Sequence, residues 1–254
     1  MITSIDLNAD LGESYGPWPM GDDAAMLSFV SSANIACGGH AGDPETMFKT
    51  LELAHQRGVA VGAHPGYPDL LGFGRRRLPY TPAEVQRFCV AQIGALVAMA
   101  SLAGTRVRYV KPHGALANLA ADDRAVAEAI AEGASVIGGL AVLAISGTEL
   151  ADAARARGLS AHDEIFADRG YTSRGRLVPR EHPAAMITDP DVAAQRLVSF
   201  LRTGLMPTID GPDIALKAHS VCIHGDSPHA VAMARRVRDA LNDAGVTIGP
   251  FVTE

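Results

Sequence analysis

Short apolar segments alternate with helix-forming segments along the chain, and this alternation limits the possible folds more than any other feature. Seven segments have the composition of buried strands: residues 5–9, 33–36, 59–63, 108–110, 140–145, 164–167 and 219–223. Most are continuous apolar runs, which is typical of parallel strands that are covered on both faces. A strand followed by a helix, repeated about seven times, predicts one α/β domain with a parallel sheet.

The segments between these strands carry the start and stop signals of helices. Thr81, Pro82 and Glu84 form a capping box before an apolar-periodic stretch that ends at Gly104. Four more helices are expected to begin at Asp43, Ser146, Asp189 and Ser227. The right-handed crossovers of such units either close a barrel or leave an open, doubly wound sheet. No GxGxxG motif of a dinucleotide-binding fold is present, so we expect a closed parallel β/α barrel formed by residues 1–254 as one domain.

Length, charge and cysteine usage narrow the classes of function. The 254 residues suit a single β/α barrel. A formal net charge of −6 argues against nucleic acid or an anionic membrane as the main partner. Neither a secretory signal nor an uninterrupted apolar stretch of membrane-spanning length is apparent. Three widely spaced cysteines indicate reduced thiols in a cytoplasmic protein, and Cys37 is more typical of a small core residue than of a nucleophile.

Polar residues gather where the predicted strands end. The stretch YVKPHGAL, residues 109–116, changes within three positions from an apolar strand to Lys111, Pro112 and His113. Similar residues follow the other strands: Asn8, Asp10, Glu13, Asn34, His40, His64, Asp168, Arg169, His224 and Asp226. Because the C-terminal ends of parallel barrel strands meet at one rim, we expect these side chains to share a pocket.

Carboxylates, imidazoles and an amine on one rim suit two kinds of chemistry. They can hold a divalent metal that polarises a carbonyl or activates water, or they can act as general acid and base. Lys111 could stabilise an oxyanion or a phosphate. The loop GFGRRR, residues 72–77, would suit an anion through Arg75 and Arg76, although a solvated face is nearly as good an interpretation. No GxSxG, HExxH or GxxxxGK[ST] motif supports a serine hydrolase, a zincin or a P-loop.

Each of these residues also has a purely structural interpretation. A single His64 or His113 is more often a hydrogen-bonded structural histidine, Asp10 could cap a turn, and Lys111 could extend to solvent. The recurrence of polar residues at successive strand ends nevertheless favours a shared site, because independent structural roles would not select the same rim repeatedly.

Long motifs run through the chain in a fixed order, from Ile5 to about Val246: IDLNADLGES, SANIACGGHAGDP, GVAVGAHPGYPDLLGFGRR, VKPHGAL, FADRGY, LVPR and HGD. In these motifs the chain resembles the LamB/YcsF family, whose members are now called the A subunit of 5-oxoprolinase. The resemblance implies a fold similar to the irregular seven-stranded β/α barrel of the glycoside hydrolase/deacetylase superfamily. Related enzymes of that superfamily often bind a metal through an Asp and two His at strand ends, and the matching positions here are Asp10, His64 and His113.

The resemblance further implies a cytoplasmic component of an ATP-dependent 5-oxoprolinase, which opens 5-oxo-L-proline to L-glutamate together with subunits B and C. On this basis we assign catalytic roles to Asp10, Glu13, His40, His64, Lys111, His113 and Asp226. We assign substrate or phosphate binding to Asn34, Arg75, Arg76, Asp168, Arg169 and His224.

Two alternatives remain beside this assignment. One is a metal-dependent amidohydrolase or deacetylase that acts alone, and the other is a non-catalytic, ligand-binding subunit of the complex. The chain also departs from the family pattern at Gly39, where Phe is usual, and at Ala117, where Tyr is usual. Both changes replace an aromatic side chain near the expected pocket with something small, which puts the shape of that pocket in question.

Overall fold

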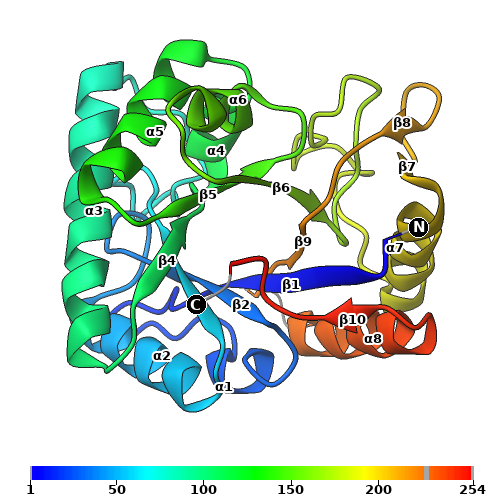
Figure 1. The fold of residues 1–254 in the computed structure, drawn as a ribbon, viewed down its shortest axis with the longest axis horizontal. Coiled ribbons are helices and arrows are strands. Elements are labelled where there is room, and N and C mark those ends of the chain that lie inside the picture. The colour runs from blue at the N-terminus through cyan, green and yellow to red at the C-terminus, as the bar shows by residue number, and fades with distance from the viewer. Residues whose placement is uncertain (1, 226–228, 253–254) are drawn as a thin grey trace.

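Seven parallel strands close into a barrel in the computed structural model, which describes residues 2–225 and 229–252. In their order around the barrel they are β1 (Ser4–Leu11), β2 (Ser32–Ala36), β3 (Ala60–His64), β4 (Val107–Val110), β5 (Ala141–Ile145), β6 (Ala161–Phe166) and β9 (Ser220–Ile223). Strand β9 pairs with both β6 and β1, which closes the ring (Figure 1). The predicted closed barrel and its seven strands are therefore confirmed.

Helices cover the outside of the barrel (Figure 1). They are α1 (Asp23–Met26), α2 (Pro44–Gln56), α3 (Pro82–Leu102), α4 (Gly114–Ala120), α5 (Arg124–Ile137), α6 (Glu149–Ala156), α7 (Pro190–Thr203) and α8 (Ala230–Asp243). The predicted caps at Asp43, Thr81 and Asp189 accept the expected backbone N–H groups. The predicted start at Ser146 is wrong, because α6 begins after Thr148 and the Ser146 hydroxyl instead accepts from the backbone of Lys217. The predicted start of α8 at residue 227 lies outside the described residues.

Three short strands complete the fold outside the barrel. β7 (Leu205–Met206) and β8 (Ile214–Ala215) form an antiparallel pair between α7 and β9, and β10 (Thr247–Ile248) pairs with the start of β1. Phe251 follows β10 and packs against Tyr109, Ala141 and Leu143. These contacts cover the end of the barrel opposite the strands' C-terminal tips.

Strand β1 shows why the barrel has a polar interior. Its apolar residues, such as Leu7 and Ala9, belong to the main hydrophobic core, whereas Asp6, Asn8 and Asp10 bond inside the barrel to side chains of β9, β6 and β2 respectively. Because successive side chains of a strand point to opposite faces, the sequence DLNAD places one polar residue at every second position on the inside. This strand therefore alternates, and it is not one of the continuous apolar runs.

Gly62 makes room for an aromatic ring inside the barrel. A Cβ at this position would lie 2.1 Å from the ring of Tyr109 on the neighbouring strand β4. The ring can therefore cross the interior, where its hydroxyl donates to Asn34 Oδ1 at 2.7 Å. The glycine is required here by close approach and not by its backbone angle.

Helix α3 is the one helix of the described residues that is long and apolar enough to span a membrane. A helix that packs in a protein core can have the same length and apolar composition. The buried residues of α3, which include Cys89, Ile93 and Leu96, pack in the main core, and the helix contacts α2, α5, β3 and β4. Its composition is therefore explained by packing on the barrel.

Candidate active site and metal centre

The C-terminal tips of the strands surround a cavity of about 520 Å³. Its floor includes Asp10, Glu13, His64, Lys111, His113 and Glu164. Its outer wall comes from the segment between β6 and α7, including Arg169 and residues 176–181. The expectation that residues far apart in the chain converge at one rim agrees with this arrangement.

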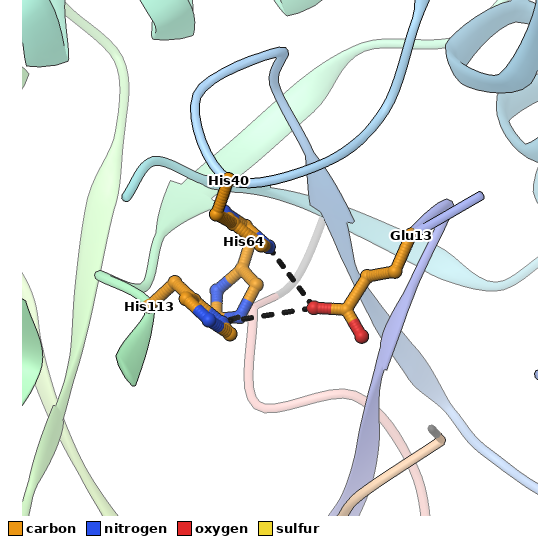
Figure 2. Close-up of side chains that lie close together, drawn as sticks. All are labelled: Glu13, His40, His64 and His113. Carbon is orange, nitrogen blue, oxygen red and sulfur yellow. Dashed lines mark hydrogen bonds and ion pairs between the residues drawn. The ribbon is translucent and has the colours of Figure 1, made fainter. Parts of the chain in front are cut away.

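Three histidines and one glutamate lie close together at the cavity floor, and all of them except His40 line the cavity (Figure 2). Ligand atoms of Glu13, His40, His64 and His113 all lie within 4.8 Å of one another, and all four residues are buried. Glu13 Oε1 lies 3.0 Å from His40 Nε2 and 3.6 Å from His113 Nδ1. The rings of His40 and His113 stack with their centroids 3.6 Å apart.

Two backbone carbonyls set which nitrogens face the cavity. His64 Nδ1 lies 2.7 Å from the Lys111 carbonyl, and His113 Nε2 lies 2.8 Å from the Phe73 carbonyl. A carbonyl only accepts, so both of these nitrogens carry the proton and donate. The remaining nitrogens, His64 Nε2 and His113 Nδ1, therefore present lone pairs to each other at 3.0 Å.

This arrangement fits a bound cation. Two facing lone pairs repel unless a proton or a metal ion lies near both. Metal-bound histidines typically donate their second N–H to a carbonyl or carboxylate, as His64 and His113 do here. Ligands at about 2.0–2.1 Å from a tetrahedral zinc ion lie about 3.3 Å apart, close to the separations found here. The donor set of Glu13, His40, His64 and His113 thus suits a divalent metal.

Asp10, which was expected among the metal ligands, lies beside this cluster. Its Oδ2 is 3.4 Å from His64 Nε2, while Oδ1 accepts from Lys111 Nζ and Asn34 Nδ2, both at 2.8 Å. Burial alone would raise the pKa of Asp10, but His64 and Lys111 hold it well below its ordinary value. Asp10 is therefore ionised at neutral pH, with one oxygen turned toward the histidines.

Lys111 lies at the base of the cavity and does not extend to solvent, since only 4% of it is exposed. Its Nζ is 2.8 Å from Asp10 Oδ1 and 3.0 Å from Glu164 Oε1. Burial would lower the pKa of Lys111, yet Asp10, Cys222 and Glu164 together raise it well above its ordinary value. Lys111 is thus an ammonium, which suits oxyanion stabilisation and not nucleophilic attack.

Glu164 is a site residue that sequence reasoning missed. It accepts from Asn8 Nδ2 at 2.9 Å and pairs with Lys111 inside the barrel. Burial raises the pKa of Glu164, and Lys111 opposes that shift. An acidic residue at the start of the apolar run 164–167 was the available signal, because a carboxylate inside a buried strand needs a partner.

A second carboxylate–histidine pair lies on the other side of the cavity. His224 Nδ1 is 2.8 Å from Asp168 Oδ2, and the imidazole stacks on Phe166. Burial would raise the pKa of Asp168, but the contact with His224 lowers it overall. An ionised Asp168 fixes the N–H of His224 on Nδ1, which leaves Nε2 to take part in acid–base chemistry.

The remaining predicted residues fall in different places. Arg75 and Arg169 line the cavity, and the buried Arg169 donates to the carbonyls of Val178 and Ala185. Burial, together with nearby Arg180, lowers the pKa of Arg169 to about 10. Arg76 instead pairs with Asp69 and does not line the cavity. Asn34 is buried beneath the cavity floor, where its side-chain amide donates to Asn8 and Asp10. Asp226 lies outside the described residues.

Three smaller expectations concern individual positions. Cys37 is buried, and burial raises the pKa of its thiol to about 12, which fits a core residue. Ala117 lines the cavity, so its small side chain widens that wall. Gly39 lies against the side-chain amide of Gln92, and a Cβ at Gly39 would be 2.4 Å from Gln92 Oε1. Gln92 thus fills the space beside Gly39 and bonds the backbone of Gly66.

Comparison with known proteins places this site in a family. The model of the LamB/YcsF family matches residues 5–254. The chain belongs to the LamB/YcsF family. Among its relatives is a protein of Azorhizobium caulinodans named as the A subunit of 5-oxoprolinase, which is 50% identical over 98% of this chain and 99% of its own length.

Solved structures agree with this membership. A lactam utilization protein from Thermus thermophilus superposes with a TM-score of 0.91 at 44% identity, covering 97% of this chain and 99% of its own. A T48 deacetylase solved with substrate superposes with a TM-score of 0.51 at 12% identity, covering 97% of this chain and 87% of its own. The second likeness shows that the LamB/YcsF barrel shares its fold with a deacetylase.

Proposed function

We propose that this chain is the A subunit of a cytoplasmic, ATP-dependent 5-oxoprolinase, which acts with subunits B and C. The observation that carries the proposal is the pair of lone-pair nitrogens, His64 Nε2 and His113 Nδ1, beside Glu13 on the floor of the cavity. Relatives that share about half of the sequence over nearly its whole length are named as the A subunit of 5-oxoprolinase. Together these support hydrolysis of a lactam, which is a cyclic amide.

The proposed reaction opens the ring of 5-oxo-L-proline by hydrolysis. Water adds its oxygen to the lactam carbonyl carbon, the C–N bond breaks, and the nitrogen takes up a proton to give L-glutamate. A lactam is a poor electrophile because its nitrogen lone pair is delocalised into the carbonyl. Ring opening is also unfavourable enough to be coupled to the hydrolysis of ATP, which consumes a second water and gives ADP and phosphate. ATP is accordingly proposed as co-substrate of the assembly.

The side chains on the cavity floor can perform the required steps. Glu13, His40, His64 and His113 would hold a divalent metal, which when bound polarises a carbonyl or lowers the pKa of water. Asp10, ionised and with Oδ2 beside His64, would accept the proton of the attacking water. The Lys111 ammonium would stabilise the negative charge that develops on the carbonyl oxygen.

The opposite wall would serve the leaving group and the substrate carboxylate. His224 would act as an imidazolium: Asp168 would hold its Nδ1–H, and Nε2–H would donate its proton to the departing nitrogen. Arg75 and Arg169 line the same cavity and would attract the carboxylate or a phosphate. The two halves of the cavity thus hold the base and the acid apart, as hydrolysis of an amide requires.

Replacement of Asp10 or His113 by Ala tests the proposal. With purified subunits B and C, ATP and 5-oxo-L-proline, each variant is expected to lose at least about 100-fold in glutamate formation, because each removes a proposed catalytic group. Circular dichroism should show the wild-type fold. Arg202→Ala, an exposed change on α7, is the control and should retain wild-type turnover. Glutamate formation at the wild-type rate by Asp10→Ala and His113→Ala would end the assignment.

A stand-alone metal-dependent amidohydrolase is a second candidate, which the cluster of Glu13, His40, His64 and His113 favours. That enzyme would hydrolyse 5-oxo-L-proline or an N-acyl substrate without ATP or partner subunits. Turnover by the purified chain with added Zn²⁺ or Mn²⁺ would support it.

A non-catalytic carrier is the third candidate. Isothermal titration of this chain alone with 5-oxo-L-proline, and separately with ATP, shows which ligand it binds. Binding of 5-oxo-L-proline combined with full activity of the Asp10 and His113 variants in the assembly would favour the carrier.

A further inference from the structure

The segment of residues 69–77, between β3 and α3, touches the candidate site with one face. The Phe73 carbonyl accepts from His113 Nε2 at 2.8 Å. The Phe73 ring lies edge-on to His113 and to His40, with centroids 5.2 and 5.4 Å apart. We call residues 69–77 the site loop, since its inner face fixes which nitrogen of His113 faces the cavity.

The site loop has a defined shape. Asp69 is buried, accepts from Gly72 N at 2.9 Å, and pairs with Arg76 across the loop. Gly74 N donates to the Asp69 carbonyl at 3.0 Å. Phe73 has a φ of 52°, the one positive φ of a non-glycine residue in the described part of the chain. Such a backbone persists only where surrounding contacts hold it, and it is found preferentially at functional positions.

The outer face of the site loop is apolar and cationic. Leu71 is 99% exposed and Leu70 is 46% exposed, although both lie in a loop that the hydrogen bonds and the ion pair of Asp69 hold in place. Arg76 and Arg77 follow in the same loop and are also exposed, whereas Arg75 lines the cavity. A fixed, fully exposed leucine near two exposed arginines is typical of a protein-binding surface, and the positive charge of this surface favours a partner with acidic groups around an apolar recess.

We propose that the site loop is the docking surface for a partner subunit of the same enzyme, and that docking on Leu71 steadies the Phe73 carbonyl on His113. This inference rests on the proposed function. The partner is taken to be another subunit because relatives that this chain covers almost completely are named as one subunit of an enzyme. Docking here would place the partner at the edge of the cavity, where its side chains can contact or complete the site.

Leu71→Asp tests the inference, because it places a negative charge on the apolar contact without touching the cavity. Subunits B and C are titrated into a fixed amount of this chain, and ATP-dependent glutamate formation is measured. The half-saturating partner concentration is expected to rise at least ten-fold, while the rate at saturation stays within about two-fold of wild type. Co-elution with B or C in size-exclusion chromatography should weaken in parallel.

Leu102→Asp is the matched control. Leu102 is 72% exposed at the C-terminal end of α3, whereas the site loop precedes the start of that helix. This variant should assemble and turn over as wild type does. Unchanged half-saturation in Leu71→Asp would overturn the inference, and so would equal weakening in both variants or co-elution of the wild type only with a second copy of itself. If the wild-type chain forms no glutamate with saturating B and C, the proposed function fails instead.

Discussion

Lys111 balances two carboxylates beneath the cavity. Its ammonium lies within 3.0 Å of both Asp10 and Glu164, and all three side chains are almost fully buried. Charges taken out of water are tolerated when they are paired, and loss of one partner leaves the others uncompensated. The lysine therefore supports the fold as well as the proposed chemistry.

Lys111→Met is expected to lower the free energy of unfolding by about 3–5 kcal/mol, because two buried carboxylates lose their counter-charge. Arg124→Met is the control, since Arg124 and its partner Glu128 are about half exposed and should contribute less than about 1 kcal/mol. Urea denaturation of the three proteins measures both changes. Equal losses in the two variants would contradict this view of Lys111.

Asp6, near the other end of the barrel, makes stability depend on pH. Burial raises its pKa to about 6, although hydroxyls of Ser220, Ser31 and Ser32 donate to it and oppose the shift. The folded-state pKa is above the unfolded value, so the stabilisation is complete below about pH 4 and is lost as the pH rises through 6.

Asp6→Asn removes this titration. Between pH 4 and pH 7, the free energy of unfolding of the wild type should therefore fall by on the order of 3 kcal/mol more than that of the variant, because of the size of the Asp6 pKa shift. Unfolding free energies of both proteins at several pH values provide the measurement. Parallel pH profiles would show that Asp6 does not titrate in this range.

Among the elements, β3 and β4 fit each other through a glycine and an aromatic ring. The Tyr109 ring occupies the space where Gly62 has no side chain, and its hydroxyl reaches Asn34 on β2. One aromatic side chain thus links three neighbouring strands below the site.

Gly62→Ala is expected to destabilise the protein by about 1–3 kcal/mol, because the new methyl group must displace the ring. Tyr109→Ala removes the obstacle. The loss of unfolding free energy in the double variant should therefore be smaller than the sum of the losses in the two single variants, and chemical denaturation can measure the difference. Strict additivity would mean that the methyl group and the ring do not meet.

The strands and three helix caps were predictable, because their signals are local. Short segments rich in apolar residues marked all seven barrel strands, although β1 alternates, and Asp43, Thr81 and Asp189 precede prolines at helix starts. Helix α5 was not identified, since Asp123 caps it without a following proline and alanines fill much of its length. Local signals of this kind locate elements but do not show which interior residues meet.

At the scale of the whole molecule, closure of the barrel decides which predicted residues become neighbours. It joined His64 and His113 from adjacent strands, and it also brought Glu13 and His40 into one cluster with them, beside Asp10. It paired Glu164 with Lys111 across the interior, which no pattern within one segment could reveal. Arg76, by contrast, bonds within its own loop, because Asp69 lies seven positions before it.

The barrel also concentrates negative charge. Asp6, Asp10, Glu13 and Glu164 are all less than a tenth exposed, and Lys111 is the one buried ammonium paired with any of them among the described residues. Burial opposes the ionisation of two of these groups, as the raised pKa values of Asp6 and Glu164 indicate. A divalent cation beside Glu13 would offset much of the remainder.

Metal content tests the central claim most directly. After dialysis against Zn²⁺ and then against metal-free buffer, elemental analysis should find about one ion per wild-type chain. Glu13→Ala and His113→Ala should retain less than a tenth of that amount, and His224→Ala should retain all of it, because His224 pairs with Asp168 away from the cluster. A wild-type chain without metal, or equal metal in Glu13→Ala, His113→Ala and the wild type, would contradict the metal centre on which the proposed chemistry depends.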